Sequence, residues 1–509
     1  MSAAFLRNLA IWYHQLHNSY FSIERNYMNC IYKNALFTDF YELTMAQGYW
    51  KRQMTMPVVF DYFFRKHPFN GGYSVFAGLA TLIEALEEFS FSQDDLEYLS
   101  TLGIFENEFL HFLSSFRFRG TIYAAREGEI IFPQEPVVRI EADLISAQII
   151  EGLVLNVLNF QTLIATKTAR IWNASHRGSI MEFGLRRAQG ADGALSASRA
   201  AFIGGAMGTS NTLAGKEYGI SVLGTMAHSW VMSYPSELDA FNAYAEIYPQ
   251  NTTFLIDTYN SLESGIINAI EVGKKLKEKG YSFGVRLDSG DIDYLSRAIR
   301  ARLDEAGFMD AKIVVSNELD EEIIESLVDD GAPIDIWGVG TNLVTGGNEA
   351  AFAGVYKLAA IDSEDRLRPV MKFSDNPEKS TNPGIKNLWR LYDENGAARL
   401  DLISCQDEKI QEGLEYIVHH PSADWRRLKI TPARVEPLLF KVMDKGNLTE
   451  TLPNIKQIQA FMKERIQTFD STYLRLLNPH IYKVSITDRL YDLKVYLINS
   501  FLKHKLSRN

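Results

Sequence analysis

Three residues in the middle of the chain have side chains suited to acid–base or nucleophilic chemistry. His228, Asp257 and Asp288 each come shortly after a short apolar run. A histidine at the end of a strand can act as a general acid, a general base or a nucleophile, although a lone histidine is more often a hydrogen-bonded structural residue. A carboxylate one strand later can orient the second ring nitrogen, which is the role we predict for Asp257. Asp288 can bind ribose hydroxyls or a hydrated Mg²⁺ ion.

Other residues in the same loops are suited to binding an anion. Arg186 and Arg187 follow another apolar run, and at most one of them can point into a common site because neighbouring side chains diverge. A Gly-Val-Gly-Thr-Asn segment offers backbone N–H groups around Gly340 and the hydroxyl of Thr341 to a phosphate. Glycines after a strand are usually plain turn residues, so this segment indicates a phosphate site only where other anion ligands converge. Asp291 sits where a helix should begin, which favours a helix-capping role.

The elements that must position these residues are short strands alternating with amphipathic segments. The apolar runs are 179–183, 221–223, 253–256, 283–287, 312–315 and 334–337, with a further candidate at 355–361. Each run has the length of a buried parallel strand, and the segments between them are long enough for crossover helices. Such alternation predicts a (β/α) barrel or a wound parallel sheet, in which the loops after the strands carry the chemistry.

Length and composition limit the class of protein. The chain has 509 residues and a formal net charge of −11, with its charges scattered, which argues against a protein that coats nucleic acid. Two cysteines cannot form a disulfide framework, and no apolar stretch is long enough to span a membrane. We therefore expect a soluble cytoplasmic protein. From the residues alone it is an α/β enzyme that acts on a phosphorylated, ribose-containing anion, and the acceptor stays open.

Six ordered motifs together resemble the nicotinate phosphoribosyltransferase family. They are Thr38-Asp-Phe-Tyr-Glu-Leu-Thr, Phe60-Asp-Tyr-Phe-Phe-Arg, Glu182-Phe-Gly-Leu-Arg-Arg, Gly224-Thr-Met-Ala-His-Ser, Val285-Arg-Leu-Asp-Ser-Gly-Asp and Gly338-Val-Gly-Thr-Asn-Leu. The resemblance runs from about residue 34 to the C-terminus. It implies an enzyme that joins nicotinic acid to 5-phosphoribosyl 1-diphosphate, giving nicotinate mononucleotide and diphosphate in NAD salvage. It also implies Mg²⁺, ATP hydrolysis coupled through a phosphohistidine, and a homodimer with sites at the interface.

The resemblance also implies roles for individual residues. His228 resembles the phosphorylated histidine, Asp257 the carboxylate that orients it, and Asp288 a ligand of the ribose and the metal. The expected nicotinate-binding residues are Tyr41 of the partner subunit and Phe183, which sandwich the pyridine ring, and Thr225 and Arg286, which hold its carboxylate. The expected phosphoribosyl diphosphate-binding residues are Arg186, Gly340, Thr341, Lys357 and Lys372.

The resulting fold class is α/β, with a (β/α) barrel-like catalytic domain and an α+β domain formed by the N-terminal and C-terminal segments. We expect an extension outside the fold at 1–33, of which 1–27 should be dispensable, and an N-terminal α+β domain at 34–146. The barrel is predicted at 147–362, opening with a long helix over 147–172. A C-terminal region at 363–509, with a helix over 488–502, should pack on the N-terminal domain.

Several alternatives stay open. The related nicotinamide enzyme carries an Asp after a Gly-Thr pair where this chain has Ser210, and an Asp there would repel a carboxylate, so Ser210 favours nicotinate. A nicotinamide or quinolinate phosphoribosyltransferase is the first alternative. A non-catalytic sensor of NAD metabolites would be expected to lack His228 or Asp288. A metal-dependent barrel aldolase or hydrolase would need a Schiff-base lysine or a His/Asp metal cluster.

Overall fold

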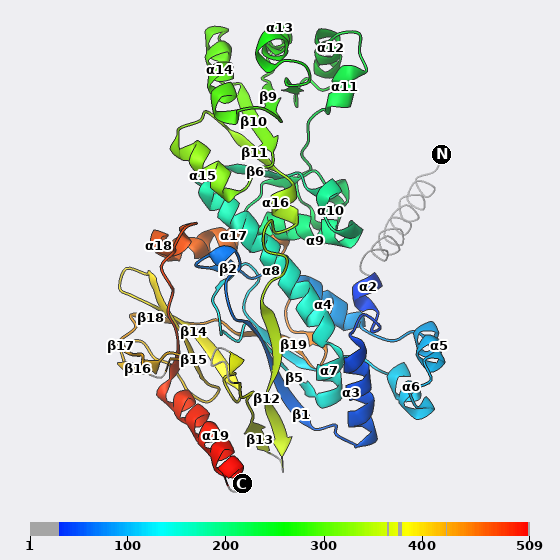
Figure 1. The fold of residues 1–509 in the computed structure, drawn as a ribbon, viewed down its shortest axis with the longest axis vertical. Coiled ribbons are helices and arrows are strands. Elements are labelled where there is room, and N and C mark those ends of the chain that lie inside the picture. Colours follow the sequence, from blue (N-terminus) through cyan, green and yellow to red (C-terminus); the bar gives the residue numbers. More distant parts are fainter. Residues whose placement is uncertain (1–29, 364–365, 375–378, 424, 507–509) are drawn as a thin grey trace, which may run out of the picture.

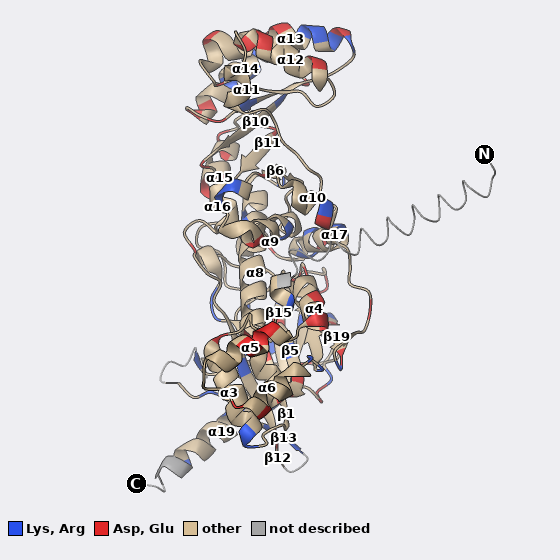
Figure 2. Ribbon diagram, turned by 90° about the vertical axis from the view of Figure 1, so that its right-hand side faces the viewer, with Lys and Arg blue, Asp and Glu red and all other residues tan. Residues whose placement is uncertain are grey.

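A computed structural model describes residues 30–363, 366–374, 379–423 and 425–506 (Figure 1). The segment 1–27, predicted to be dispensable, lies outside the described residues. The molecule is elongated, with the strands β9 to β11 towards one end and β1, β12 and β13 towards the other. Lysine and arginine positions are interspersed with aspartate and glutamate positions along the ribbon (Figure 2). None of the helices in the described part of the chain combines the length and apolar composition needed to cross a membrane.

A six-stranded parallel sheet forms the predicted barrel-like unit. Its order is β7-β6-β11-β10-β9-β8. The strands are β6 (Ser179–Glu182), β7 (Gly208–Thr209), β8 (Thr253–Leu255), β9 (Gly284–Leu287), β10 (Lys312–Asn317) and β11 (Ile336–Val339). This is the cyclic order of a barrel, and among the described residues no pairing joins β7 to β8. The predicted mixed α/β class with a parallel sheet is confirmed.

Two of the predicted runs differ from the expectation. The run 221–223 makes only an isolated parallel bridge, from Val222 to Thr209 at the edge of the sheet. The candidate run at 355–361 belongs to β12 (Gly354–Ser363), which pairs antiparallel with β1 (Pro57–Phe64) in a different sheet. An apolar run alone does not reveal which neighbour it pairs with, and this one continues away from the barrel.

Helices follow the barrel strands as crossovers. They include α9 (Gly190–Ile203), α11 (His228–Met232), α12 (Glu237–Ile247), α13 (Ile266–Glu278), α14 (Ile292–Glu305), α15 (Glu321–Asp329) and α16 (Thr341–Val344). The side chain of Asp291 accepts a hydrogen bond from the Tyr294 N–H at 3.1 Å and caps α14, as predicted. The consecutive β10 residues Ile313, Val314 and Val315 point to alternate faces of the sheet and are each at most 2% exposed, so the sheet is covered on both faces.

A long helix connects the barrel to the rest of the molecule. The helix predicted at 147–172 is divided at Ile150 into α7 (Leu144–Ile149) and α8 (Glu151–Ala174). Arg199 of α9 makes a buried ion pair with Glu127 at 2.6 Å. Arg170 of α8 makes another with Glu321 of α15 at 2.9 Å. Because removing one partner of a buried ion pair leaves an uncompensated charge, the Arg170 pair constrains how α8 meets α15.

A seven-stranded sheet lies at the other end, and widely separated parts of the chain contribute to it. Its order is β13-β12-β1-β5-β3-β19-β20. Besides β1 and β12, its strands are β3 (Thr121–Ala124), β5 (Val138–Asp143), β13 (Arg366–Pro369), β19 (Phe440–Asp444) and β20 (Asn447–Leu448). The helices of the same N-terminal segment are α2 (Cys30–Lys33), α3 (Phe40–Lys51), α4 (Leu79–Glu88), α5 (Gln93–Thr101) and α6 (Asn107–Ser114). A two-stranded ribbon joins β2 (Ser74–Val75) to β4 (Ile130–Ile131).

The C-terminal segment forms a third sheet in the order β17-β16-β21-β15-β14-β18. Its strands are β14 (Lys386–Tyr392), β15 (Ala398–Cys405), β16 (Tyr416–His419), β17 (Arg427–Ile430), β18 (Arg434–Pro437) and β21 (Val484–Thr487). The helices here are α17 (Ile455–Arg465), α18 (Ser471–Leu474) and α19 (Asp488–Leu506). The predicted helix over 488–502 is confirmed by α19.

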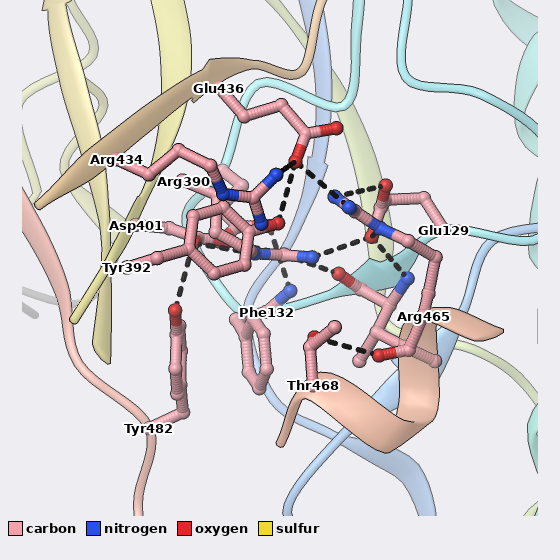
Figure 3. Close-up of polar contacts among 12 residues, drawn as sticks. Glu129, Phe132, Arg390, Tyr392, Asp401, Arg434, Glu436, Arg465, Thr468 and Tyr482 are labelled. Carbon is pink, nitrogen blue, oxygen red and sulfur yellow. Dashed lines mark hydrogen bonds and ion pairs between the residues drawn. The ribbon is translucent and has the colours of Figure 1, made fainter. Parts of the chain in front are cut away.

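Buried charges join this third sheet to the N-terminal segment (Figure 3). Arg390 has no solvent exposure and binds Asp401 at 2.6 Å and Glu129, just before β4, at 2.5 Å. Arg465 of α17 contacts the same Glu129 at 2.9 Å and Glu436 of β18 at 2.8 Å. Ion pairs shared between guanidinium groups satisfy charges that would otherwise be costly to bury.

Candidate functional site

Arg286 is the centre of a polar cluster at the C-terminal edge of the barrel strands. It lies in β9, and its guanidinium donates to a hydroxyl of β10, to a hydroxyl of the loop before α11 and to a carboxylate of the loop after β9. Nε donates to Ser316 Oγ at 2.8 Å, Nη1 to Thr225 Oγ1 at 2.9 Å and Nη2 to Asp288 Oδ1 at 2.9 Å. The structure thus brings together three residues that were predicted to share a site, Thr225, Arg286 and Asp288.

Phe183 forms an aromatic wall of this cluster. The Arg286 guanidinium carbon lies 5.5 Å from the centre of the Phe183 ring, within the range of a cation–π contact. The backbone N–H of Phe183 donates to Val339 O at 2.8 Å, which ties the end of β6 to β11. A side chain at Gly338 would place its Cβ only 2.8 Å from Phe183 Cδ2, so glycine is required there for the ring to occupy its position.

Asp288 is held as a carboxylate by its neighbours. Its Oδ1 accepts from Arg286 and from the Ser316 hydroxyl. Burial acts to raise the pKa of Asp288, but the Ser316 hydrogen bond and the charge of Arg286 outweigh it, so the pKa lies below its usual value. Its other oxygen, Oδ2, faces His228 Nε2 at 3.9 Å.

His228 is the first residue of α11 and projects towards Asp288. Its side chain is 42% exposed, so an approaching phosphate group could reach it. Nδ1 lies 3.1 Å from the Thr258 hydroxyl oxygen, whereas Asp257 was predicted to orient this ring. Thr258, one residue further along, therefore takes the contact that was expected of Asp257. This arrangement leaves Nε2 as the nitrogen on the side of Asp288.

Asp257 supports the loop after β9. Its Oδ2 accepts from the backbone N–H of Asp288 at 3.0 Å and from the Ser289 hydroxyl at 2.6 Å. Its Oδ1 is buried and has no hydrogen-bond partner among the described residues. The carboxylate therefore fixes the backbone that carries Asp288, and its second oxygen is left without a partner among those residues.

Two residues of the site, and one buried carboxylate beside it, were missed by sequence reasoning. Ser316 and Thr258 hydrogen-bond directly to Arg286 and His228. Glu182, at the end of β6, is fully buried and accepts from Ser198 Oγ at 2.8 Å, from the Thr209 hydroxyl and from the Gly184 N–H. Thr258 and Ser316 follow apolar runs, and Glu182 lies within one, where a charged residue next to Phe183 was a detectable signal.

The loop after β11 closes another side of the cluster. Gly340 precedes the single-turn helix α16, and its carbonyl accepts from the N–H groups of Leu343 and Val344 at 3.2 Å each. Thr341 is half-buried at the start of this turn. Arg186 lies in the short 3₁₀ helix Leu185–Arg187 after β6, is exposed, and forms no ion pair among the described residues. The predicted role of these three residues in binding phosphate stays a prediction.

The remaining predicted residues lie at the opposite end of the molecule. Tyr41 belongs to α3 and Lys357 to β12, far from α11 in Figure 1. Burial, with the negative charges of Glu151 and Glu42, raises the pKa of Tyr41, and the Lys357 ammonium lies 3.7 Å from the same Glu151. Lys372 is exposed and follows β13. One chain therefore does not bring these residues to Arg286, but Tyr41 and Lys357 share one surface.

The described residues contain no cluster of three or more His, Cys, Asp and Glu side chains that could hold a metal ion. The carboxylates nearest the site are those of Asp288 and Asp257. Mg²⁺ in enzymes is commonly bound by one or two carboxylates together with substrate phosphates. This donor set fits a Mg²⁺ ion that arrives with its substrate.

Comparison with known proteins identifies a family over most of the chain. Profiles described as the nicotinate phosphoribosyltransferase (NAPRTase) N-terminal domain, the NAPRTase family and the NAPRTase C-terminal domain match residues 36–159, 179–415 and 385–494. The chain is 40% identical over 467 residues to the nicotinate phosphoribosyltransferase of Bacillus subtilis, covering 91% of this chain and 95% of that protein. It is 46% identical over 458 residues to nicotinate phosphoribosyltransferase pncB2 of Mycobacterium tuberculosis, with coverages of 90% and 92%.

Solved structures of related proteins have a fold similar to that of this chain. The human nicotinic acid phosphoribosyltransferase superposes with a TM-score of 0.78 at 29% identity, covering 90% of this chain and 99% of that chain. A nicotinate-nucleotide pyrophosphorylase from Pyrococcus furiosus superposes with a TM-score of 0.66 at 24% identity, covering 85% and 95%, which is a likeness of fold.

Proposed function

Because the chain belongs to the nicotinate phosphoribosyltransferase family, we propose that the Arg286 cluster binds nicotinic acid and joins it to 5-phosphoribosyl 1-diphosphate. The products are nicotinate mononucleotide and diphosphate, and the reaction serves NAD salvage. The observation that carries this assignment is the position of Arg286, with Thr225 bonded to Nη1 and Phe183 beside the guanidinium. A cation at the edge of an aromatic wall suits a flat ring that carries a carboxylate.

The hydrogen-bonding capacity of Arg286 supports a carboxylate ligand. A guanidinium has five N–H donors, and described residues use three of those of Arg286. Two remain for the substrate, which matches the two oxygens of a carboxylate. Ser210, where the related nicotinamide enzyme has an Asp, adds no negative charge near the end of β6, to which its N–H is bonded. An anionic base would therefore be preferred over a neutral amide.

The ribosyl transfer itself requires positioning and charge stabilisation. The bond between the ribose C1′ and the diphosphate oxygen breaks, and a new bond forms from C1′ to the pyridine nitrogen, with positive charge developing on the ribose. The carboxylate of Asp288 is placed to stabilise that charge and to bind ribose hydroxyls. Asp288 and the free oxygen of Asp257 would hold Mg²⁺, which neutralises the leaving diphosphate when bound. Arg186, Gly340 and Thr341 would contact the phosphates.

ATP hydrolysis would be coupled through His228. Thr258 occupies Nδ1, so Nε2 is the nitrogen available for phosphorylation, on the same side as Asp288. Phosphorylation of a side chain adds roughly −1.5 to −2 charges. That charge beside Asp288 would rearrange the surrounding loops, so that substrate affinity changes between the phosphorylated and unphosphorylated enzyme.

A homodimer would complete the site. Tyr41, Lys357 and Lys372 lie away from Arg286 within one chain, and α3 also exposes Phe40 (57%) next to Tyr41 (47%). We expect this surface of the partner to cover the mouth of the barrel. Tyr41 would then close the pyridine ring against Phe183, while the two lysines would reach the phosphates. The protein would act in the cytoplasm.

Incubation with 5-phosphoribosyl 1-diphosphate, Mg²⁺ and one pyridine at a time tests the reaction. Nicotinate should yield its mononucleotide, whereas nicotinamide and quinolinate should yield little. Mononucleotide from nicotinamide alone would assign the protein to the nicotinamide reaction, and no product from any base would favour a sensor. The coupling is tested separately with His228→Ala, which should lose ATP stimulation but keep basal transfer. His111→Ala, on the exposed face of α6, is the matched control.

A further inference from the structure

At one edge of the Arg286 guanidinium, three hydrogen bonds form a closed ring that joins Arg286, Ser316 and Asp288. Nε donates to Ser316 Oγ at 2.8 Å, Nη2 donates to Asp288 Oδ1 at 2.9 Å, and the Ser316 hydroxyl itself donates to that same Asp288 oxygen. Ser316 is only 3% exposed, so water does not readily replace its hydroxyl. Each member of the ring therefore restricts the rotation of the other two.

The backbone around Ser316 is fixed as firmly as its side chain. Ser316 pairs with Gly338 in the register of β10 and β11, and the space above Gly338 is filled by the Phe183 ring. The next residue, Asn317, has a φ of 132°, which is rare for a residue other than glycine. Strained residues of this kind persist where the surrounding structure determines them and often mark functional sites. The Ser316 hydroxyl is thus presented to Arg286 from a rigid position.

The ring determines which donors Arg286 offers to the substrate. With Nε and one N–H of Nη2 engaged, the free donors lie on Nη1 and Nη2, beside Thr225. Without the Ser316 hydroxyl, Nε and Nη2 could both bind the two oxygens of Asp288, because side-on pairing of guanidinium and carboxylate is favourable. Such a pair would turn the guanidinium towards Asp288 and also occupy the carboxylate that is needed at the ribose.

We infer that Ser316 is a positioning residue for substrate selection. It keeps Arg286 available for the carboxylate of the pyridine and Asp288 available for the ribose. The hydroxyl directs Arg286 towards the carboxylate of the pyridine and prevents a closed Arg286–Asp288 pair. This inference rests on the proposed function, because it assumes that Arg286 binds that carboxylate. Its consequence is specific: loss of the hydroxyl weakens the recognition of an acid more than the recognition of an amide.

The test is steady-state kinetics of Ser316→Ala with nicotinate and nicotinamide. We expect the KM for nicotinate to rise about 10- to 100-fold, the range for a charged group that loses a hydrogen-bond partner, while kcat changes much less. The kcat/KM ratio of nicotinate to nicotinamide should fall about tenfold or more. Ser316→Cys, which is slightly larger and keeps only a weak hydrogen-bonding group, should fall between the wild type and Ser316→Ala. Ser326→Ala, on the exposed side of α15, is the matched control.

The outcomes separate this inference from the proposed function. Wild-type protein that forms no nicotinate mononucleotide would overturn the proposed function. Active wild type with an unchanged selectivity ratio in Ser316→Ala would overturn the inference alone, and so would equal losses with both bases. If thermal melting shows that Ser316→Ala does not fold, the kcat/KM ratio of nicotinate to nicotinamide is measured for Ser316→Cys instead. An unchanged ratio in that variant would overturn the inference.

Discussion

At the level of single residues, the proposed function depends on a guanidinium whose donors would be divided between protein and substrate. Arg286 donates one N–H each to Ser316, Thr225 and Asp288, so two of its five N–H donors are left for the substrate. A lysine has no planar fork and could not satisfy these partners and a carboxylate together.

Arg286→Lys should therefore weaken nicotinate binding strongly. Each lost hydrogen bond to a charged group corresponds to about a 10- to 100-fold loss, so kcat/KM for nicotinate should fall at least that far. The measurement is initial rates of mononucleotide formation over a range of nicotinate concentrations. Arg297→Lys, at an exposed ion pair in α14, should have no such effect. An Arg286→Lys enzyme with an unchanged KM for nicotinate would contradict the assigned role.

Sequence reasoning identified most of the side chains of the cluster but not their pairings. Thr225, Arg286 and Asp288 were predicted together, and the structure joins them directly. Thr258 instead of Asp257 faces His228, because side chains of adjacent residues in a loop diverge and the choice depends on backbone angles that composition does not specify. Ser316 was overlooked because a small hydroxyl carries little signal until its partners are known.

At the level of elements, the strands of the barrel were predictable because their burial leaves near-continuous apolar runs. Which strands pair with each other was less predictable. The run around Tyr356 is as apolar as its predecessors, yet β12 pairs with β1 far away in sequence. Register is set by contacts between distant segments, which a local pattern cannot reveal. Gly338 shows how closely two elements can approach, since it lets Phe183, directly after the first barrel strand, lie against β11.

Gly338→Ala should disturb the aromatic wall. Its Cβ would lie 2.8 Å from Cδ2 and 2.9 Å from Cε2 of Phe183, so the ring or the strand must move. Overpacking of this kind costs about 1–3 kcal/mol of stability. We expect a lower melting temperature together with a higher KM for nicotinate. Gly193→Ala in α9, where a Cβ would meet nothing within 4 Å, is the control. Unchanged stability and kinetics in Gly338→Ala would show that Phe183 is not confined by this contact.

At the level of the whole molecule, buried carboxylates and guanidinium groups hold the N-terminal and C-terminal segments together. Glu135 is fully buried and contacts Asp401, the partner of Arg390. Burial raises the pKa of Glu135 well above its usual value, and the negative charge of Asp401 raises it further, against the effect of Arg390. Glu135 therefore stays protonated in the folded protein at pH values where it ionises in the unfolded chain.

This difference predicts how stability depends on pH. Because the folded protein binds the Glu135 proton more tightly, this group's contribution falls as pH rises from the unfolded pKa to the folded one, by up to about 1.4 kcal/mol per pH unit. Glu135→Gln cannot ionise, so its stability relative to wild type should increase as pH rises from 5 to 8. Urea unfolding of both proteins across this range is the measurement, with the exposed Glu394→Gln as control. A difference between Glu135→Gln and wild type that does not change with pH would contradict the prediction.

The proposed dimer can be tested by complementation between inactive subunits. Tyr41→Ala and His228→Ala affect residues that we place in one composite site but on different chains. Co-expressed with different tags and mixed at random, they should regain about one quarter of wild-type ATP-stimulated activity, because half of the dimers are mixed and each has one intact site of two. Each variant expressed alone should lack that activity. Absence of any recovery in isolated mixed dimers would place Tyr41 outside the partner's site.

The most direct test of the central claim is a competition between nicotinate and nicotinamide at equal concentration in one reaction. The wild-type protein, with 5-phosphoribosyl 1-diphosphate, Mg²⁺ and ATP, is sampled over time, and the two mononucleotides are separated and quantified. Recognition of the pyridine carboxylate by Arg286 predicts that nicotinate mononucleotide is essentially the sole product. Predominant formation of nicotinamide mononucleotide, or equal amounts of both, would contradict it.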